Sequence, residues 1–328
     1  MNAMKITRRA ALTAGAAAFA APALGQQRET IRFLIGAAPG GPVEGYARVI
    51  AEHMQKTLGA TIVVETKPGA NGSIAAQTIV ELPPDGKTLW IGTQSMIEIN
   101  HLVYANVKFQ PSDFTVLMKG LEGPIGLVVN PNVPAKTFPE FIGWVKKNPG
   151  KLSFTTYSAG TSAHFLGVQF NERFGTDLTH APYRGSAPQV QDLIAGHAQI
   201  GFVQMPGVMA QIEAGTLRPI VTTGAKRFGP LPDTPTLVEL GYPDFLATVW
   251  YGLMVRHDTP DAIKQRFIDA AKLAHADPDV RKALAPQGLE IVAITGEEMR
   301  EQIRALTQDI EKIASKSASN SGVEVAHV

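Results

Sequence analysis

The feature that most constrains the fold is a regular alternation between short apolar runs and longer segments with helical spacing. The run IRFLIG at 31–36 is typical of a buried strand. Apolar residues then recur every three or four positions from Tyr46 to Leu58, which predicts a helix with one buried face that ends at Gly59. The same order continues with a strand at 61–66, a helix at 73–82 and a strand at 88–93. Strands that alternate with helices predict a parallel sheet covered by helices.

The second half of the chain repeats this pattern. Strands are predicted at 125–130, 152–158, 199–204 and 217–224, and helices at 137–148, 163–175, 188–196 and 207–215. Later helices are predicted at 260–276, 278–287 and 296–315. We therefore expect two α/β lobes with the second inserted into the first: residues 26–124 and 248–316 form lobe 1, and 125–247 form lobe 2. The polar residues 317–328 are expected to fray.

The N-terminus has the pattern of a secretory signal peptide. Lys5, Arg8 and Arg9 precede an apolar, alanine-rich run, and small residues follow before Gln26. The run is shorter than the roughly 20 residues that a spanning helix needs. We expect residues 1–25 to be removed on export to the periplasm, after Gly25 or Ala23, by the Sec or the twin-arginine route.

Composition limits the classes of partner. The chain has no cysteine, so neither a disulfide nor a lipid anchor on cysteine is expected. Without the signal segment, 27 Lys and Arg face 29 Asp and Glu, a net charge of −2. Because no basic run is present, nucleic acid is not an expected partner. We expect a soluble monomer.

The loop after the first strand, GAAPGGPVEG at 36–45, is the first candidate site. Its adjacent glycines allow the backbone to approach a ligand closely, and the start of the next helix favours an anion. Glu44 could cap the helix amides or accept a hydrogen bond from a ligand; an ordinary tight turn is the alternative. The spacing fits no nucleotide-binding glycine motif. The candidate binding residues here are Pro39, Gly40, Gly41, Pro42 and Glu44.

A second candidate loop, YSAGTS at 157–162, follows a strand in the second half. It offers hydroxyls and exposed amides from Ser158, Ala159, Gly160, Thr161 and Ser162. A helix cap is the alternative interpretation. The segment is not the G-x-S-x-G turn of a hydrolase nucleophile, so a secreted α/β hydrolase using Ser162 or Glu44 is a weaker hypothesis.

Three further residues complete the predicted binding site. Ser95 follows the third strand, Arg184 could pair with a carboxylate through its planar guanidinium, and Gln204 ends another strand. The eight histidines show no metal-binding spacing, so no metal, catalytic residue or cofactor is expected. Glycine amides, hydroxyls and helix starts would hold an anion without breaking a bond.

Several ordered motifs resemble one known family. PGGPVEGYARVIAEHMQKTLGATIVVETKPGANGSIAAQTIVELPPDGKTL is similar to the opening of the Bug-type, or TctC-type, extracytoplasmic solute receptors of tripartite tricarboxylate transport systems. The segments PYRGSAPQVQDLIAGHAQIGF and LPDTPTLVELGYPDF resemble later parts of the same family. The likeness runs from about Ile31 to Leu306. Val43 and Glu44 depart from the usual Thr and Asp.

The resemblance implies a type II-like, two-lobed periplasmic binding protein fold with a ligand cleft between the lobes. It implies that the first loop and the loop at 158–162 hold the carboxyl groups of a small organic acid: a mono- or dicarboxylate, an aromatic acid or an amino acid. The partner would be a membrane permease or, alternatively, a membrane sensor.

Overall fold

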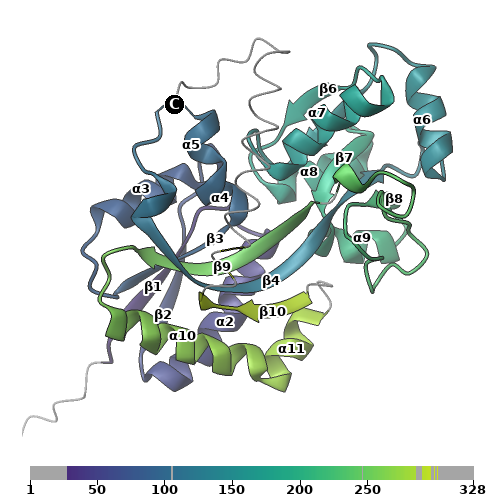
Figure 1. The fold of residues 1–328 in the computed structure, drawn as a ribbon. Coiled ribbons are helices and arrows are strands. Elements are labelled where there is room, and N and C mark those ends of the chain that lie inside the picture. The colour runs from purple at the N-terminus through teal and green to yellow at the C-terminus, as the bar shows by residue number, and fades with distance from the viewer. Residues whose placement is uncertain are drawn as a thin grey trace, which may run out of the picture.

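A computed structural model describes residues 28–104, 106–245, 247–285 and 290–296, together with residues 299 and 301. The predicted signal peptide and the predicted C-terminal tail lie outside these residues. The described part is a mixed α/β structure of two lobes joined by long strands (Figure 1). This confirms the predicted fold class.

Lobe 1 is built on three parallel strands. They are β1 (Thr30–Ile35), β2 (Thr61–Thr66) and β3 (Thr88–Thr93), with β1 in the middle. One face packs against α2 (Pro42–Leu58), α10 (Asp261–Ala276) and α11 (Pro278–Leu284). The other face carries η1 (Ala70–Gly72), α3 (Ser73–Glu81), α4 (Gln94–Glu98) and α5 (Asn100–Val103) (Figure 1). Apolar side chains cover both faces of β1 and β3, as expected for buried parallel strands, whereas the edge strand β2 is partly exposed.

Lobe 2 repeats this plan with its own core. The parallel strands are β5 (Ser153–Thr156), β6 (Thr179–Pro182) and β7 (Ile200–Gln204), with β5 in the middle. The helices are α6 (Phe138–Lys146), α7 (Ser162–Phe174), α8 (Ser186–Ala195), η3 (Met205–Val208), α9 (Met209–Glu213) and η4 (Pro243–Phe245). A cluster of aromatic rings from α6, α7 and β7 fills one side of the sheet.

Two long antiparallel strands connect the lobes. β4 (Phe114–Val129) pairs with β9 (Thr248–Arg256) as far as Pro124, and then with β7 and with β8 (Arg218–Thr222). The short helix η2 (Pro111–Asp113) leads into β4. β10 (Glu290–Ile294) pairs with the lobe 1 part of β4 in antiparallel orientation. The sequence predicted only the second half of β4. Glycines and Pro124 interrupt its pattern, and Pro124 lies where the strand changes partners. The residue boundaries of the lobes stay a prediction.

Local signals explain where the helices that border the lobe interface begin and end. α2 has Pro42 in its first turn and ends at Gly59, whose φ of 63° suits the left-handed conformation that glycine tolerates. α7 begins after Thr161, whose side chain accepts a hydrogen bond from the His164 amide. The starts of both helices follow a parallel strand, which directs them toward the same edge of their sheets.

Candidate functional site

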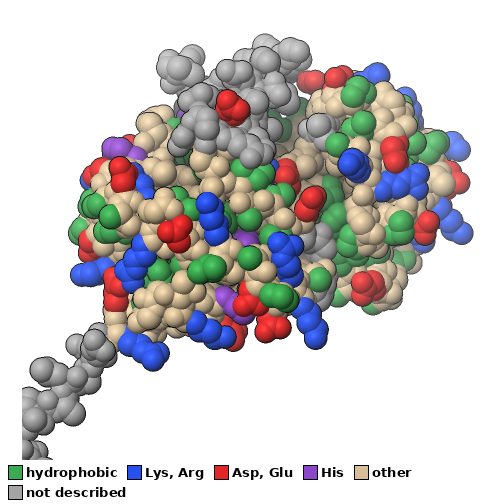
Figure 2. Space-filling view, turned by 60° about the horizontal axis from the view of Figure 1, so that its bottom comes forward, with side chains coloured by type: hydrophobic (Ala, Val, Ile, Leu, Met, Phe, Trp, Pro, Cys, Tyr) green, Lys and Arg blue, Asp and Glu red, His purple; other side chains and the backbone are tan. Residues whose placement is uncertain are grey.

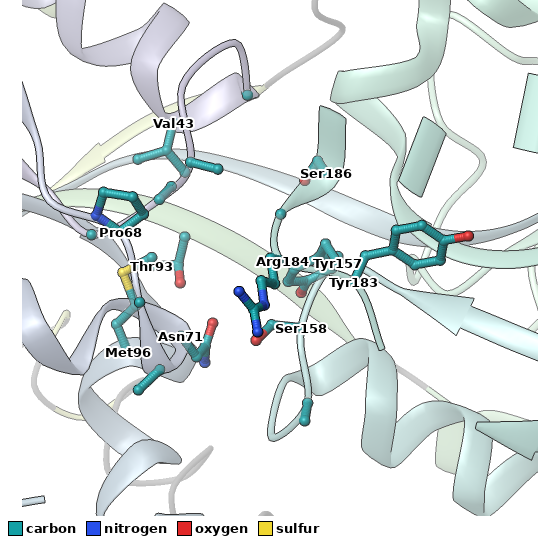
Figure 3. Close-up of a pocket in the computed structure, with 18 of the residues that line it drawn as sticks. Val43, Pro68, Asn71, Thr93, Met96, Tyr157, Ser158, Tyr183, Arg184 and Ser186 are labelled. Atoms are coloured by element: carbon teal, nitrogen blue, oxygen red, sulfur yellow. The ribbon is translucent and has the colours of Figure 1, made fainter. Parts of the chain in front are cut away.

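A cavity of about 640 Å³ lies between the two lobes. Its walls come from loops that follow strands in both lobes (Figure 3). The lobe 1 wall contains Gly36, Ala37, Ala38, Gly41, Pro42, Val43, Pro68, Gly69, Ala70, Asn71, Thr93, Met96 and Tyr104. The lobe 2 wall contains Tyr157, Ser158, Ala159, Pro182, Tyr183, Arg184, Gly185, Ser186 and Gln204. The size suits a small molecule.

The first loop contributes its backbone and the start of α2. Gly41, Pro42 and Val43 line the cavity, so the positive end of the helix dipole lies at its wall. The side chain of Glu44 turns back on its own loop: Oε2 accepts a hydrogen bond from the Gly40 amide at 2.7 Å, and Oε1 pairs with Arg48. These hydrogen bonds hold the pKa of Glu44 below its usual range. The Glu44 side chain therefore stabilises the conformation of its own loop. Pro39, Gly40 and Glu44, which the sequence analysis selected, are not among the residues that line the cavity.

The second loop runs from the end of β5 to the start of α7. Tyr157, Ser158 and Ala159 line the cavity, whereas Gly160, Thr161 and Ser162 are not among its lining residues. The hydroxyls of Thr156 and Thr161 both donate to the carbonyl of Ser158, each at 2.9 Å. This carbonyl is therefore occupied within the loop, and the Ser158 side chain is left beside the cavity (Figure 3).

Arg184 is the one formally charged residue among the described lining residues. Figure 3 shows its guanidinium extending from lobe 2 into the cavity, toward the wall with Asn71 and Thr93. Within the described chain it forms no ion pair with a carboxylate, so its charge is available to an anion. Gln204 also lines the cavity, as the sequence predicted.

Ser95 supports the lobe 1 wall from behind. Its hydroxyl lies 3.2 Å from that of Thr93, which faces the cavity, and 3.4 Å from the Asn71 amide nitrogen. Asn71 also donates to Asn100 at 2.8 Å. These bonds orient the Asn71 side chain, which the sequence analysis did not select. A signal for it exists in the GANG turn, where Asn71 has a φ of 48°.

Several contacts join the two walls. The Tyr104 hydroxyl from lobe 1 donates to the Ala159 carbonyl of lobe 2 at 2.9 Å. The Tyr251 hydroxyl on β9 donates to Gln204 Oε1 on β7 at 2.6 Å. The two lobes are therefore in direct contact beside the cavity. Both tyrosines were missed in the sequence because their partners lie more than 45 positions away.

The chemistry of the lining favours binding of an anion. Burial raises the pKa of Tyr104 and of Tyr157, so both hydroxyls remain protonated donors at neutral pH. The Tyr157 hydroxyl is buried, and hydrogen bonding to Gln204, Thr161 and Ala163 offsets part of the effect of burial on its pKa. Among the described lining residues there is no Asp, Glu, His, Lys or Cys. The described residues also hold no cluster of three metal-ligating side chains.

On the face shown in Figure 2, Lys and Arg are interspersed with Asp and Glu rather than gathered in one basic patch. In the part of the chain that the structure describes, no helix combines the length and the hydropathy needed to span a membrane.

Comparisons with known proteins give a consistent assignment. Protein BugT of Bordetella pertussis is 31% identical over 276 residues, which cover 82% of this chain and 83% of BugT. A solved structure described as a periplasmic transporter is 35% identical, with a TM-score of 0.81 over 86% of this chain and 96% of that one.

Two other solved structures contain bound acids. Rpa4515 of R. palustris, solved with adipate, is 27% identical with a TM-score of 0.84, covering 88% of this chain and 97% of that chain. MatC of Rhodopseudomonas palustris, solved with bound malate, is 26% identical with a TM-score of 0.76, covering 91% and 99%. The profile of the family described as tripartite tricarboxylate transporter family receptor (TctC) matches residues 46–317. This chain therefore belongs to the TctC family of tripartite tricarboxylate transporter receptors.

Proposed function

We propose that this chain is a periplasmic receptor that captures a small organic carboxylate between its two lobes and delivers it to a membrane permease. The observation that carries the proposal is the cavity between the lobes, walled by backbone loops, hydroxyls and the single cation Arg184. Relatives with bound adipate and malate support a carboxylate as the ligand class.

Neutral donors perform most of the recognition in this proposal. The α2 N-terminus at Gly41 and Pro42 faces the loop at Ser158 across the cavity, and a carboxylate between them would accept hydrogen bonds from both lobes. The ligand then holds the lobes together, because each lobe contributes donors to the same anion. The Tyr157 hydroxyl lines the cavity and is a further donor to an acceptor that enters it.

Release without chemical change is part of the same proposal. The described lining offers no carboxylate, imidazole or thiol to act as a general base or nucleophile. The permease is proposed as the partner from the family description.

A thermal-shift panel tests the proposal on the mature protein. The panel contains acetate, succinate, malate, adipate, citrate and benzoate, with succinamide as the uncharged control. A ligand at 100 times its Kd stabilises the folded state by about 2.7 kcal/mol, because it binds only that state. We expect at least one acid, and not the amide, to raise the melting temperature by several degrees. If no acid at millimolar concentration changes it, the carboxylate assignment is wrong.

Delivery needs a separate measurement. The closed, ligand-loaded receptor is mixed with solubilised membranes of the source cells, and bound membrane proteins are recovered. Recovery of transporter membrane subunits supports delivery, whereas recovery of a sensor kinase would replace the permease as the partner.

A further inference from the structure

We propose that His164 and His180 are positioning residues for the ligand site: as a stacked, neutral pair they hold the loop 157–161 in its cavity-lining shape, and protonation of the pair releases that loop. The proposal rests on the proposed function, since the loop in question forms the lobe 2 wall of the cavity.

The two imidazoles lie directly against each other beneath the loop. Their ring centroids are 3.9 Å apart and the planes differ by 12°. The second face of His180 stacks on Phe154, at 4.9 Å and 23°. Phe154 is a buried residue of β5, so the rigid sheet of lobe 2 supports the stack.

His164 forms a hydrogen bond with the loop, and His180 forms one with the strand residue that precedes it. The Gly160 amide donates to His164 Nδ1 at 3.3 Å, and the Thr156 hydroxyl lies 2.8 Å from His180 Nε2. Between these two points, the Ser158 carbonyl accepts from Thr156 and Thr161. The loop backbone is thus held directly by His164 at Gly160, and through the Thr156 hydroxyl by His180 at Ser158.

The hydrogen-bond directions require a neutral His164 and place a proton on Nε2 of His180. His164 Nδ1 accepts from an amide, so its proton must be on Nε2. The single hydroxyl hydrogen of Thr156 goes to the Ser158 carbonyl, so His180 Nε2–H donates to the Thr156 oxygen. A proton added at Nδ1 of His164 would point at the Gly160 N–H. Two donors cannot share that contact, and the loop must move.

The surroundings of the pair also favour the neutral form. Burial lowers the pKa of His164, and burial together with the neighbouring His164 lowers the pKa of His180 to about 3. Phe154 and Phe165 pack on the rings without charge. Within the described residues, neither ring has an ion pair with a carboxylate that would stabilise an imidazolium.

The consequence is acid-sensitive ligand binding. Well above pH 6.5 both rings are neutral in the folded and unfolded states, so holding the loop requires no loss of a proton. As the pH falls through 6.5, the form with the loop released takes up a proton on histidine, whereas the form with the loop held does not, because its histidine pKa is lowered. The form with the loop held therefore loses stability until the pH reaches that lowered pKa. If one histidine has its ordinary pKa in the ligand-free protein and must lose its proton when the ligand binds, the affinity for the ligand at pH 5.0 is at most about 30-fold weaker than at pH 7.5.

The test measures Kd by calorimetry between pH 7.5 and 5.0, using the panel acid with the largest thermal shift and correcting for that acid's own ionisation. We expect wild-type Kd to rise about tenfold. His164→Asn supplies an uncharged acceptor for the Gly160 amide, so its Kd should rise less than threefold over the same range. His164→Phe keeps a stacking ring without the acceptor and should bind more weakly at every pH. His197→Asn, at a histidine whose side chain is 75% exposed, is the matched control and should follow wild type.

A second readout does not depend on a ligand. Hydrogen exchange of the peptide containing 157–165, corrected for intrinsic rates, should increase on acidification in wild type and not in His164→Asn. The inference is overturned if wild type and His164→Asn lose affinity alike, or if exchange of this peptide is the same in both. If no panel acid binds, the proposed function fails, and the exchange measurement still decides whether the pair holds the loop.

Discussion

The contact between Gly185 and Ala38 offers the most direct test of lobe closure. Gly185 lies in lobe 2 before α8, with a φ of 129°, and Ala38 lies in the first loop of lobe 1. A Cβ added to Gly185 would lie 2.7 Å from the Ala38 Cβ, whereas ordinary contacts are 3.4–4 Å. The added methyl group of Gly185→Ala would therefore overlap with Ala38 and push the lobes apart.

The substitution has two costs that act on different states. The positive φ costs a non-glycine residue about 1–3 kcal/mol whether the lobes are open or closed, so it lowers the stability of the free protein. The overlap with Ala38 exists only in the closed form and costs about 1–3 kcal/mol, as overpacking does elsewhere. A cost confined to the closed form weakens ligand binding about 5- to 150-fold.

Calorimetry and thermal unfolding separate these two costs. We expect Gly185→Ala to show both a weaker Kd for the panel acid and a lower melting temperature without ligand. In the double variant Gly185→Ala/Ala38→Gly the new methyl group no longer meets the Ala38 Cβ. The Kd should therefore recover toward that of Ala38→Gly, while the melting temperature stays low because the positive φ at position 185 remains unfavourable. A Gly185→Ala protein with wild-type Kd would refute the reasoning, because the ligand-bound form would not bring these two residues together.

Two other variants test individual contacts at the cavity. Tyr104→Phe removes the cross-lobe hydrogen bond to the Ala159 carbonyl, worth about 0.5–1.5 kcal/mol, so we expect a 2- to 10-fold higher Kd and an unchanged melting temperature of the ligand-free protein. An equal Kd by calorimetry would show that this bond is absent from the bound form. Arg184→Gln removes the charged lining residue. Because Arg184 is exposed, we expect the affinity for succinate or adipate to fall about fivefold and that for acetate to fall less. Equal losses of affinity for all three acids would exclude pairing of Arg184 with a second carboxylate.

The fold could be predicted from the sequence because its signals are local. The apolar runs that became β1, β3 and β7 are continuous, and Gly59 and Thr161 mark helix ends by their own conformational preferences. The long strand β4 was only half predicted. Its first half is stabilised by β9, a strand more than 100 residues later, which overrides the weak propensity of its glycines.

The candidate site likewise contains residues with a local sequence signal and residues whose position depends on packing in the folded protein. Glycines and hydroxyls in the two loops indicated Gly41 and Ser158, which do face one cavity. Their role in binding stays a prediction. Tyr104 carried no comparable signal, and the GANG turn was the one indication of Asn71, because their place at the cavity depends on how α5 and η1 pack in the folded lobe. For Glu44 the sequence left capping and ligand contact open, and the structure shows its carboxylate bonded to the Gly40 amide.

The arrangement of the cavity couples recognition to closure, because residues that line the cavity also join the lobes. Tyr104 lines the wall and donates across to the second loop; Gln204 lines the opposite wall and accepts from Tyr251 on β9. A ligand that displaced either wall would lose these bonds as well as its own. Arg184 alone carries a formal charge among the described lining residues, so it cannot distinguish acids of equal charge. Discrimination among such acids must therefore come from the positions of the loops, which the closing contacts and the histidine pair hold in place.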